Sequence, residues 1–532
     1  MIPIIDIFAG PGGLGEGFTR AGFNIRLSIE RDPQAHETLL FRSFTRILQK
    51  TKKGRNSILA YFEAAQHDPV HALEELIEKH ANAYEEASNE AWLAELGGEE
   101  FPDHDVSTRI DAALNGAKEW VLIGGPPCQA YSLAGRARMK GTDPDFEDDH
   151  RHFLYKQYLR IVADHSPTIF VMENVKGILS ANVKNIEIFK QIRADLHKPG
   201  EATDISVRDS PSDVVYDLHP LIQPIQKSID DDYDPSDFLI RAEDLGIPQK
   251  RHRVFIIGIK RGSGIQMKHL IPDPDHHVSV AEVINDLPSR RSGFSRKSED
   301  DWCETLKDIK RQPWFKETQQ TDKGLTKLIS SQLNNLLKDQ NNGENIQPET
   351  RDPSKTSPKA LSKWYRERKL PYVLNHVCRN HMDSDLQRYF YAACFTLEHN
   401  YSPKLTEYPE SLLPNHQNVK KPGKKIIFDD RFRVQCSHLP STTVVSHISK
   451  DGHYYIHPNP TQCRSLTVRE AARLQTFPDD YFFQGPRTAQ FHQVGNAVPP
   501  FLAWQIGCLV SKMLGKKPKG NYSAPANTES NS

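Results

Sequence analysis

Short apolar runs recur along the first half of the chain, and longer amphipathic stretches separate them. Residues 4–8 form the first run, which leads through a glycine-rich turn and a helix ending at Gly22 into a second run at 23–30. Three similar runs follow, at 120–123, 167–172 and 253–258. Because buried strands that alternate with helices form mostly parallel sheets, this pattern predicts an α/β domain.

Two long segments depart from this rhythm. At 532 residues the chain exceeds the ~250–300 residues of a single hydrophobic core, so at least two domains are expected. The polar stretch 41–118 has a helical pattern and is interpreted as an insertion in the first domain. Towards the end, Thr467 and Glu470 have the spacing of a capping box, and an apolar helix is expected at 501–514. The resulting division is a first domain at 1–285, a second region at 286–464, a return to the first domain at 465–515 and a disordered tail at 516–532.

The composition indicates in which cellular compartment the protein is expected. No run of about 18 apolar residues exists, which excludes an obvious membrane span, and the first residues lack the basic start of a secretory signal. Seven cysteines are scattered without a Cys-x-x-Cys pair, so a disulfide framework and a zinc site are not expected. The sequence therefore favours a reducing, cytoplasmic location and no metal.

The charges of the whole chain nearly cancel, but one region has an excess of basic residues. The formal net charge is −1, yet residues 286–370 contain 18 Lys and Arg against 13 Asp and Glu, with interspersed tryptophans. Such a region can hold phosphates through its charges and reach base edges through other side chains. A solvated surface domain is the alternative.

The first turn has a nucleotide-binding pattern. Gly10, Gly12 and Gly15 satisfy G-x-G-x-x-G after a strand, and Glu30 follows at a distance where an acidic side chain can bond a ribose. The same spacing also serves turns without a ligand.

The chain places one cysteine on a rigid loop at a strand end. Residues 124–132 read GGPPCQAYS, and two prolines fix the backbone before Cys128. Cys128 is interpreted as a nucleophile, although a structural cysteine fits the loop alone equally well. Glu173 ends the run at 167–172, where a carboxylate also suits a helix N-terminus, and the basic run 249–253 enters another strand, where it faces solvent or an anion.

Six motifs in sequence order resemble the cytosine-5 DNA methyltransferase family, over residues 1–30, 120–285 and 430–515. The similar segments are 6–13 (DIFAGPGG), 125–129 (GPPCQ), 173–175 (ENV), 249–253 (QKRHR), 466–477 and 495–500 (GNAVPP). The resemblance implies a Rossmann-like methyltransferase domain with a smaller, mixed target-recognition domain inserted before the last motifs. It assigns target recognition to 286–464.

The resemblance also implies the roles of the catalytic residues. Cys128 adds to carbon 6 of a flipped-out cytosine, Glu173 relieves charge at nitrogen 3, and Arg253, with Arg251 beside it, binds the carbonyl edge of the base. Asn174 holds the acid loop in shape.

S-adenosylmethionine is the methyl donor that the family implies, with no metal. Phe8 is expected against the adenine, the glycine turn near the methionine end and Glu30 on the ribose. Asp105 is a further candidate for an adenine contact, at the end of a strand or on a loop. The full set expected to bind this cofactor is Phe8, Ala9, Gly10, Gly12, Gly13, Glu30, Asp105, Pro126, Asn496 and Val498.

The resemblance implies double-stranded DNA as the partner. It further suggests a protective role beside a separate restriction endonuclease, and we expect a monomer that associates with the nucleoid through DNA. A transfer-RNA cytosine methyltransferase would share the fold, the cofactor and Cys128. Two further hypotheses are a catalytically silent DNA-binding member of the family and an NAD-dependent oxidoreductase, and the oxidoreductase leaves Cys128, Glu173 and Arg253 without a joint role.

Overall fold

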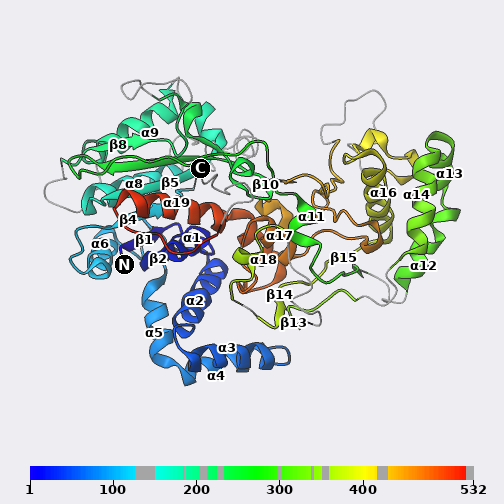
Figure 1. Ribbon diagram of the computed structural model, residues 1–532, viewed down its shortest axis with the longest axis horizontal. Coiled ribbons are helices and arrows are strands. Elements are labelled where there is room, and N and C mark those ends of the chain that lie inside the picture. The colour runs from blue at the N-terminus through cyan, green and yellow to red at the C-terminus, as the bar shows by residue number, and fades with distance from the viewer. Residues whose placement is uncertain are drawn as a thin grey trace, which may run out of the picture.

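A computed structural model shows a mixed sheet covered by helices on both faces (Figure 1). The structure describes residues 1–127, 150–183, 186–203, 213–224, 233–295, 301–336, 341–349, 359–368, 370–415 and 429–522. The main sheet has the order β3-β2-β1-β4-β5-β11-β8, and β9 also pairs with β11. Its strands are β1 Pro3–Ile7, β2 Asn24–Glu30, β3 Ala91–Leu93, β4 Val121–Gly124, β5 Ile169–Val175, β8 Tyr216–His219, β9 Leu239–Arg241 and β11 His252–Lys260. The first five in spatial order are parallel, so the α/β class predicted from the sequence is confirmed.

Helices pack against each face of this sheet. On one face α1 (Gly13–Ala21) lies against α19 (Pro500–Met513), and a Cβ on Gly17 would fall 2.4 Å from the Ala503 side chain, so only glycine permits this close crossing. On the other face the core is formed with α6 (Asp103–Leu114), α8 (His150–His165) and α9 (Ile188–His197). The closing helix therefore returns to the first domain, as its apolar spacing predicts.

Only part of the stretch 41–118 forms a separate insertion. Helices α2 (Pro33–Leu48), α3 (Lys52–Ala64), α4 (Pro69–Lys79) and α5 (Ala81–Glu90) form an arm that projects from the sheet (Figure 1). Strand β3, however, pairs with β2 at the edge of the main sheet, and α6 packs on the same domain. A three-residue strand is too short to give a recognisable alternation, which explains why the sequence did not predict it.

The region 286–464 contributes to more than one core. Helices α12 (Asp301–Lys307), α13 (Pro313–Thr321), α14 (Lys323–Asn334) and α16 (Asp383–His399) form a separate cluster, at the far end of the molecule from the sheet (Figure 1). In contrast, Trp364 and Tyr365 pack in the core of the first domain, and Ile346 and Leu374 pack against the helical arm. Short ladders complete the region; they pair β10 (Gln249–Lys250) with β16 (Ser441–Thr442), β12 (Gly293–Phe294) with β15 (Asn380–His381), and β13 (Ile346–Pro348) with β14 (Tyr372–Leu374).

The C-terminal segment is ordered further than expected. The Lys519 N–H donates to the Ala21 carbonyl at 2.8 Å, and the Tyr522 ring lies 5.2 Å from the rings of Trp364 and Trp504. The expected disorder from 516 onwards is therefore wrong for 516–522, because aromatic packing fixes Tyr522; residues 523–532 lie outside the described part. Within the described ranges, no helix is long and apolar enough to cross a membrane.

A buried ion-pair network joins α1 and α2 to the segment after α17 (Val468–Leu474). Glu16 accepts hydrogen bonds from Arg20 Nε at 2.8 Å and from Arg42 Nη2 at 2.7 Å, and Arg42 also pairs with Asp480 at 3.0 Å. Burial alone would raise the pKa of Glu16, but the two guanidinium groups prevail and lower it to about 2.

We expect Glu16→Gln to lower the free energy of unfolding at pH 7 by roughly 3 kcal/mol, because two buried arginines lose an anionic partner. A carboxyl whose pKa is lowered on folding stabilises the protein fully above its ordinary pKa and loses that contribution as pH falls towards the folded value. The difference between variant and native protein should therefore shrink between about pH 4.5 and pH 2. Denaturant unfolding from pH 7 to pH 3 measures it, with the exposed Glu85→Gln as control; an equal difference at both pH values would contradict this assignment.

Candidate functional site

The predicted site segments follow neighbouring strands. Ile7 at the end of β1 pairs with Ile29 of β2 on one side and with Gly124 of β4 on the other, and Gly124 pairs with Met172 of β5. Strand order reverses between β2-β1 and β4-β5, and ligands of open α/β sheets bind beyond the carboxyl ends at such a point. The fold thus brings together the glycine turn, Glu30, the proline loop and Glu173.

The glycine turn is held by backbone hydrogen bonds and by Glu30. The Gly10 N–H donates to Glu30 Oε2 at 2.6 Å, and the Ala9 N–H donates to the Ile29 carbonyl at 3.0 Å. Phe8 and Gly10 both have φ of 56°, which is unusual for the phenylalanine and indicates a tightly determined backbone. Burial raises the pKa of Glu30.

The glycine turn is open at Gly10 and closed at Gly13. A Cβ on Gly10 would meet nothing within 4 Å, so the backbone there faces open space beside the half-buried Phe8. A Cβ on Gly13 would lie 2.3 Å from the Val498 carbonyl oxygen, which means that Val498 closes the other side of the turn. Among the described residues no group of three metal-ligating side chains occurs.

Asn496 is the last residue of α18 (Arg487–Asn496) and is exposed, with its side-chain nitrogen 3.2 Å from the His492 ring. Two residues on, Val498 contacts the turn. Asn496 therefore lies two residues before the segment that contacts Gly13, and its side chain is exposed.

The proline loop lies against the acid motif. Pro126 is buried, and its carbonyl accepts a hydrogen bond from Asn174 Nδ2 at 3.5 Å, while Asn174 Oδ1 accepts from the Val175 N–H at 2.8 Å. Asn174 thus links the two segments. Cys128 follows Gly125 by three residues in the sequence and lies outside the described residues.

Glu173 and Arg253 form an ion pair across β5 and β11, with Arg253 Nε 3.1 Å from Glu173 Oε1. The other carboxylate oxygen, Oε2, faces the proline loop, since a Cβ on Gly125 would lie 2.9 Å from it. Burial lowers the pKa of Arg253, and the Glu173 carboxylate opposes this effect. One oxygen is therefore engaged by the arginine, and the second is directed towards the segment that continues to Cys128.

Arg251 lies deeper than Arg253. Its guanidinium is buried and donates to the carbonyl of Val444 at 2.9 Å and to that of Gly495 at 3.3 Å. Burial lowers its pKa well below the ordinary value, and the neighbouring Arg253 adds to the effect. Arg251 therefore joins the basic motif to Val444, near the end of the region 286–464, and to Gly495, the residue before Asn496, and it holds these segments together.

Asp105 is not placed as expected. It lies exposed in the first turn of α6, where its carboxylate suits the helix N-terminus, and not at a strand end. The strand beside β2 is β3, and the carboxylate that follows it is Glu95, which pairs with Arg31 next to Glu30 at 2.7 Å. The sequence did not predict β3, and the strand end was therefore expected near Asp105 instead of after Leu93.

Tyr481 contacts the glycine turn, which the sequence did not predict. Its hydroxyl donates to the carbonyl of Pro11 within the glycine turn, and a Cβ on Gly12 would lie 3.0 Å from that hydroxyl. The Arg42 guanidinium lies 4.7 Å from the Tyr481 ring centroid. The buried ion-pair network therefore packs against one face of the Tyr481 ring. Tyr481 belongs to the segment after α17, which no local signal links to the turn 470 residues earlier.

Tyr481→Phe removes this hydrogen bond but keeps the ring. We expect the dissociation constant for S-adenosylmethionine to rise about fivefold, as the loss of about 1 kcal/mol implies, with little change in the rate of the bound complex. Calorimetric titration measures the dissociation constant, and steady-state kinetics show whether KM for S-adenosylmethionine rises while kcat stays unchanged. The exposed Tyr401→Phe is the control; equal cofactor affinities in all three proteins would show that Tyr481 does not position the turn.

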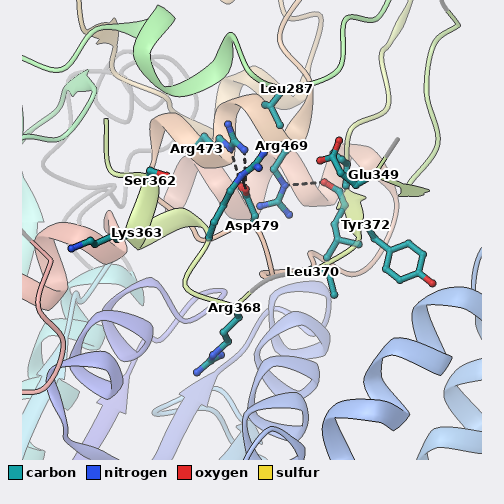
Figure 2. A pocket seen from close by; sticks show the side chains of 13 residues that line it. Leu287, Glu349, Ser362, Lys363, Arg368, Leu370, Tyr372, Arg469, Arg473 and Asp479 are labelled. Carbon is teal, nitrogen blue, oxygen red and sulfur yellow. Dashed lines mark hydrogen bonds and ion pairs between the residues drawn. The ribbon is translucent and has the colours of Figure 1, made fainter. Parts of the chain in front are cut away.

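A second feature is a cavity of about 260 Å³ whose wall includes Arg469, Arg473 and Asp479 (Figure 2). Arg473 in its wall pairs with Asp479 at 2.8 Å, and Arg469 donates to the Leu374 carbonyl at 2.8 Å. None of the expected site residues lines this cavity. Its arginines are engaged within the protein, so we assign it a structural role.

The C-5 cytosine-specific DNA methylase family model matches residues 62–210 and 219–511. The type II methyltransferase M.Bpa9945I of Bacillus paralicheniformis is 30% identical over 533 residues, which cover 96% of this chain and 99% of that protein. The type II methyltransferase M.DdeI of Desulfomicrobium norvegicum is 26% identical, over 96% of this chain and 88% of that protein. A crystal structure titled as a putative DNA modification methyltransferase encoded within an E. coli prophage matches with a TM-score of 0.50 and 19% identity, covering 97% of this chain and all of that one, and it supports the fold.

Proposed function

This chain belongs to the C-5 cytosine-specific DNA methylase family, and we propose that it methylates a flipped-out cytosine through a covalent bond to Cys128. The observation that carries the proposal is the orientation of Glu173. Arg253 engages Oε1, and Oε2 faces the loop that leads to Cys128. An acid and a nucleophile presented from adjacent strands can act on one cytosine ring.

The chemistry requires both groups. Carbon 5 of cytosine becomes nucleophilic only after the Cys128 thiolate adds to carbon 6, which converts the ring into an enamine. The negative charge that builds on the ring is relieved by a proton held by Glu173 at nitrogen 3. After methylation at carbon 5, a base removes the carbon 5 proton, the bond between carbon 6 and the Cys128 sulfur breaks, and the nitrogen 3 proton returns to Glu173, which restores the aromatic ring.

The proposed methyl donor is S-adenosylmethionine, whose sulfonium supplies an electrophilic methyl group when bound. We assign Glu30 to the ribose hydroxyls, Phe8 to the adenine and the glycine turn to the methionine end; the Gly10 N–H, which donates to Glu30, fixes the carboxylate beside the turn. Ala9, Gly12 and Pro126 complete the walls from the two neighbouring strand ends.

The cellular role that we propose is protection of DNA at a short sequence against a separate endonuclease with the same specificity. The relatives named as type II methyltransferases support this assignment. A single site supplied by one chain is compatible with a monomer that acts on cytoplasmic DNA.

Covalent trapping tests the proposal. A pool of random-sequence duplexes in which 5-fluorocytosine replaces cytosine should form a denaturation-stable complex with the protein in the presence of S-adenosylmethionine, because fluorine at carbon 5 prevents the final elimination. Cys128→Ser should form none. A complex of equal yield with that variant would exclude Cys128 as the nucleophile.

A further inference from the structure

The carboxamide of Asn375 connects the region 286–464 to the segment that carries Tyr481. Asn375 follows β14, and its side chain is almost completely buried. The Phe483 N–H donates to Asn375 Oδ1 at 2.9 Å, and Asn375 Nδ2 donates to the Phe483 carbonyl at 3.1 Å. One side chain therefore satisfies both backbone groups of a residue that lies 108 positions later in the chain.

The backbone of Asn375 is fixed by other contacts. Its N–H donates to the Asn345 carbonyl at 2.7 Å, and its own carbonyl accepts a hydrogen bond from the Arg469 N–H at 3.0 Å. Its φ is 54°, in the left-handed region that asparagine tolerates better than most residues. The carboxamide is therefore presented to Phe483 from a determined position.

Arg469 makes a second connection between the same two segments. Its guanidinium is buried; Nε donates to the Leu374 carbonyl at 2.8 Å, and Nη2 donates to the Tyr481 carbonyl at 2.5 Å. Leu374 and Asn375, which are consecutive in the region 286–464, are thus joined to Tyr481 and Phe483.

The joined segment leads directly to the glycine turn. The ring centroids of Tyr481 and Phe483 lie 5.4 Å apart, and both rings pack on Phe477. The Tyr481 hydroxyl donates to the Pro11 carbonyl. Because close-packed interiors transmit strain, a displacement of Phe483 would displace the Tyr481 ring and its hydroxyl.

We propose that Asn375 is a positioning residue for the S-adenosylmethionine site. It acts through Phe483 and Tyr481 on the Pro11 carbonyl, without contact with the cofactor. The inference rests on the proposed function, which assigns this cofactor to the glycine turn. It extends the cofactor site to a residue of the region 286–464.

Asn375→Gly removes the carboxamide and keeps a backbone that adopts a φ of 54° without strain. Calorimetric titration of the full chain should show a dissociation constant for S-adenosylmethionine about fivefold above the native value, with kcat changed less than about twofold. Asn400→Gly is the matched control, because Asn400 is also left-handed, with a φ of 64°, and lies exposed at the end of α16. It should bind the cofactor like the native protein.

A double-mutant cycle with Tyr481→Phe separates positioning from general loosening of the fold. If Asn375 acts through Tyr481, the double variant should bind S-adenosylmethionine about fivefold more weakly than the native protein, as each single variant does. Independent effects would multiply to about 25-fold. That result, or an unchanged dissociation constant in Asn375→Gly, would overturn the proposal.

Asn345→Ala provides a milder variant. The exposed Asn345 side chain accepts from Asn375 Nδ2 at 2.9 Å, and its loss should raise the dissociation constant about twofold. If Asn375→Gly does not fold, as judged by circular dichroism and the unfolding temperature, an unchanged dissociation constant in Asn345→Ala overturns the proposal. Native protein that does not bind S-adenosylmethionine at all contradicts the proposed function itself.

Discussion

Cys128→Ser is expected to bind S-adenosylmethionine normally and to transfer methyl groups to DNA at least ~10³-fold more slowly than the native protein. A serine hydroxyl has a far higher pKa than a thiol, so it is almost entirely protonated near neutral pH and adds to carbon 6 much more slowly than a thiolate. Single-turnover transfer of labelled methyl groups measures the rate of the covalent step separately from product release.

Cys508 offers a matched control for this substitution. It lies half-buried in α19, and burial raises the pKa of its thiol to about 12, so it is almost entirely protonated near neutral pH. Cys508→Ser should keep full activity. The nucleophile assignment fails if Cys128→Ser retains more than a tenth of the native rate.

Glu173→Gln is expected to lower the single-turnover rate by about 10³-fold, within the usual range for loss of a general acid. Glutamine keeps the size of the side chain but cannot deliver a proton to nitrogen 3, and it also leaves the half-buried Arg253 without its anionic partner.

A carboxylate–arginine pair elsewhere on the same sheet controls for the loss of an ion pair. Asp217 of β8 pairs with Arg261, just after β11, at 2.5 Å on the exposed side of the sheet. Asp217→Asn should change the rate less than about twofold, because exposed pairs contribute little. An equal loss of activity in both variants would mean that Glu173 acts through the sheet and not on the base.

Local signals in the sequence were sufficient for much of this architecture. The helix after the glycine turn ends at Gly22 in a left-handed conformation, and Thr467 and Glu470 exchange the hydrogen bonds of a capping box. The convergence of the glycine turn, Glu30 and Glu173 followed from the rule that parallel strands share one carboxyl edge.

The failures have a common physical cause, which is dependence on contacts distant in sequence. Strand β3 exists because β2 offers an edge, and Asp105 was placed incorrectly because that strand was missed. Tyr522 is fixed by two tryptophans, and Tyr481 reaches a turn 470 residues away. Arg251 was grouped with Arg253 because the two lie close in sequence, yet its carbonyl partners come from distant segments.

The most direct test of the central claim is transfer of labelled methyl from S-adenosylmethionine to unmodified double-stranded genomic DNA, followed by hydrolysis to nucleosides and sequencing of the methylated positions. The account predicts that all label appears as 5-methylcytosine at one short recurrent sequence. Label on transfer RNA but none on DNA would contradict the substrate, and label on DNA at any atom other than carbon 5 of cytosine would contradict the chemistry.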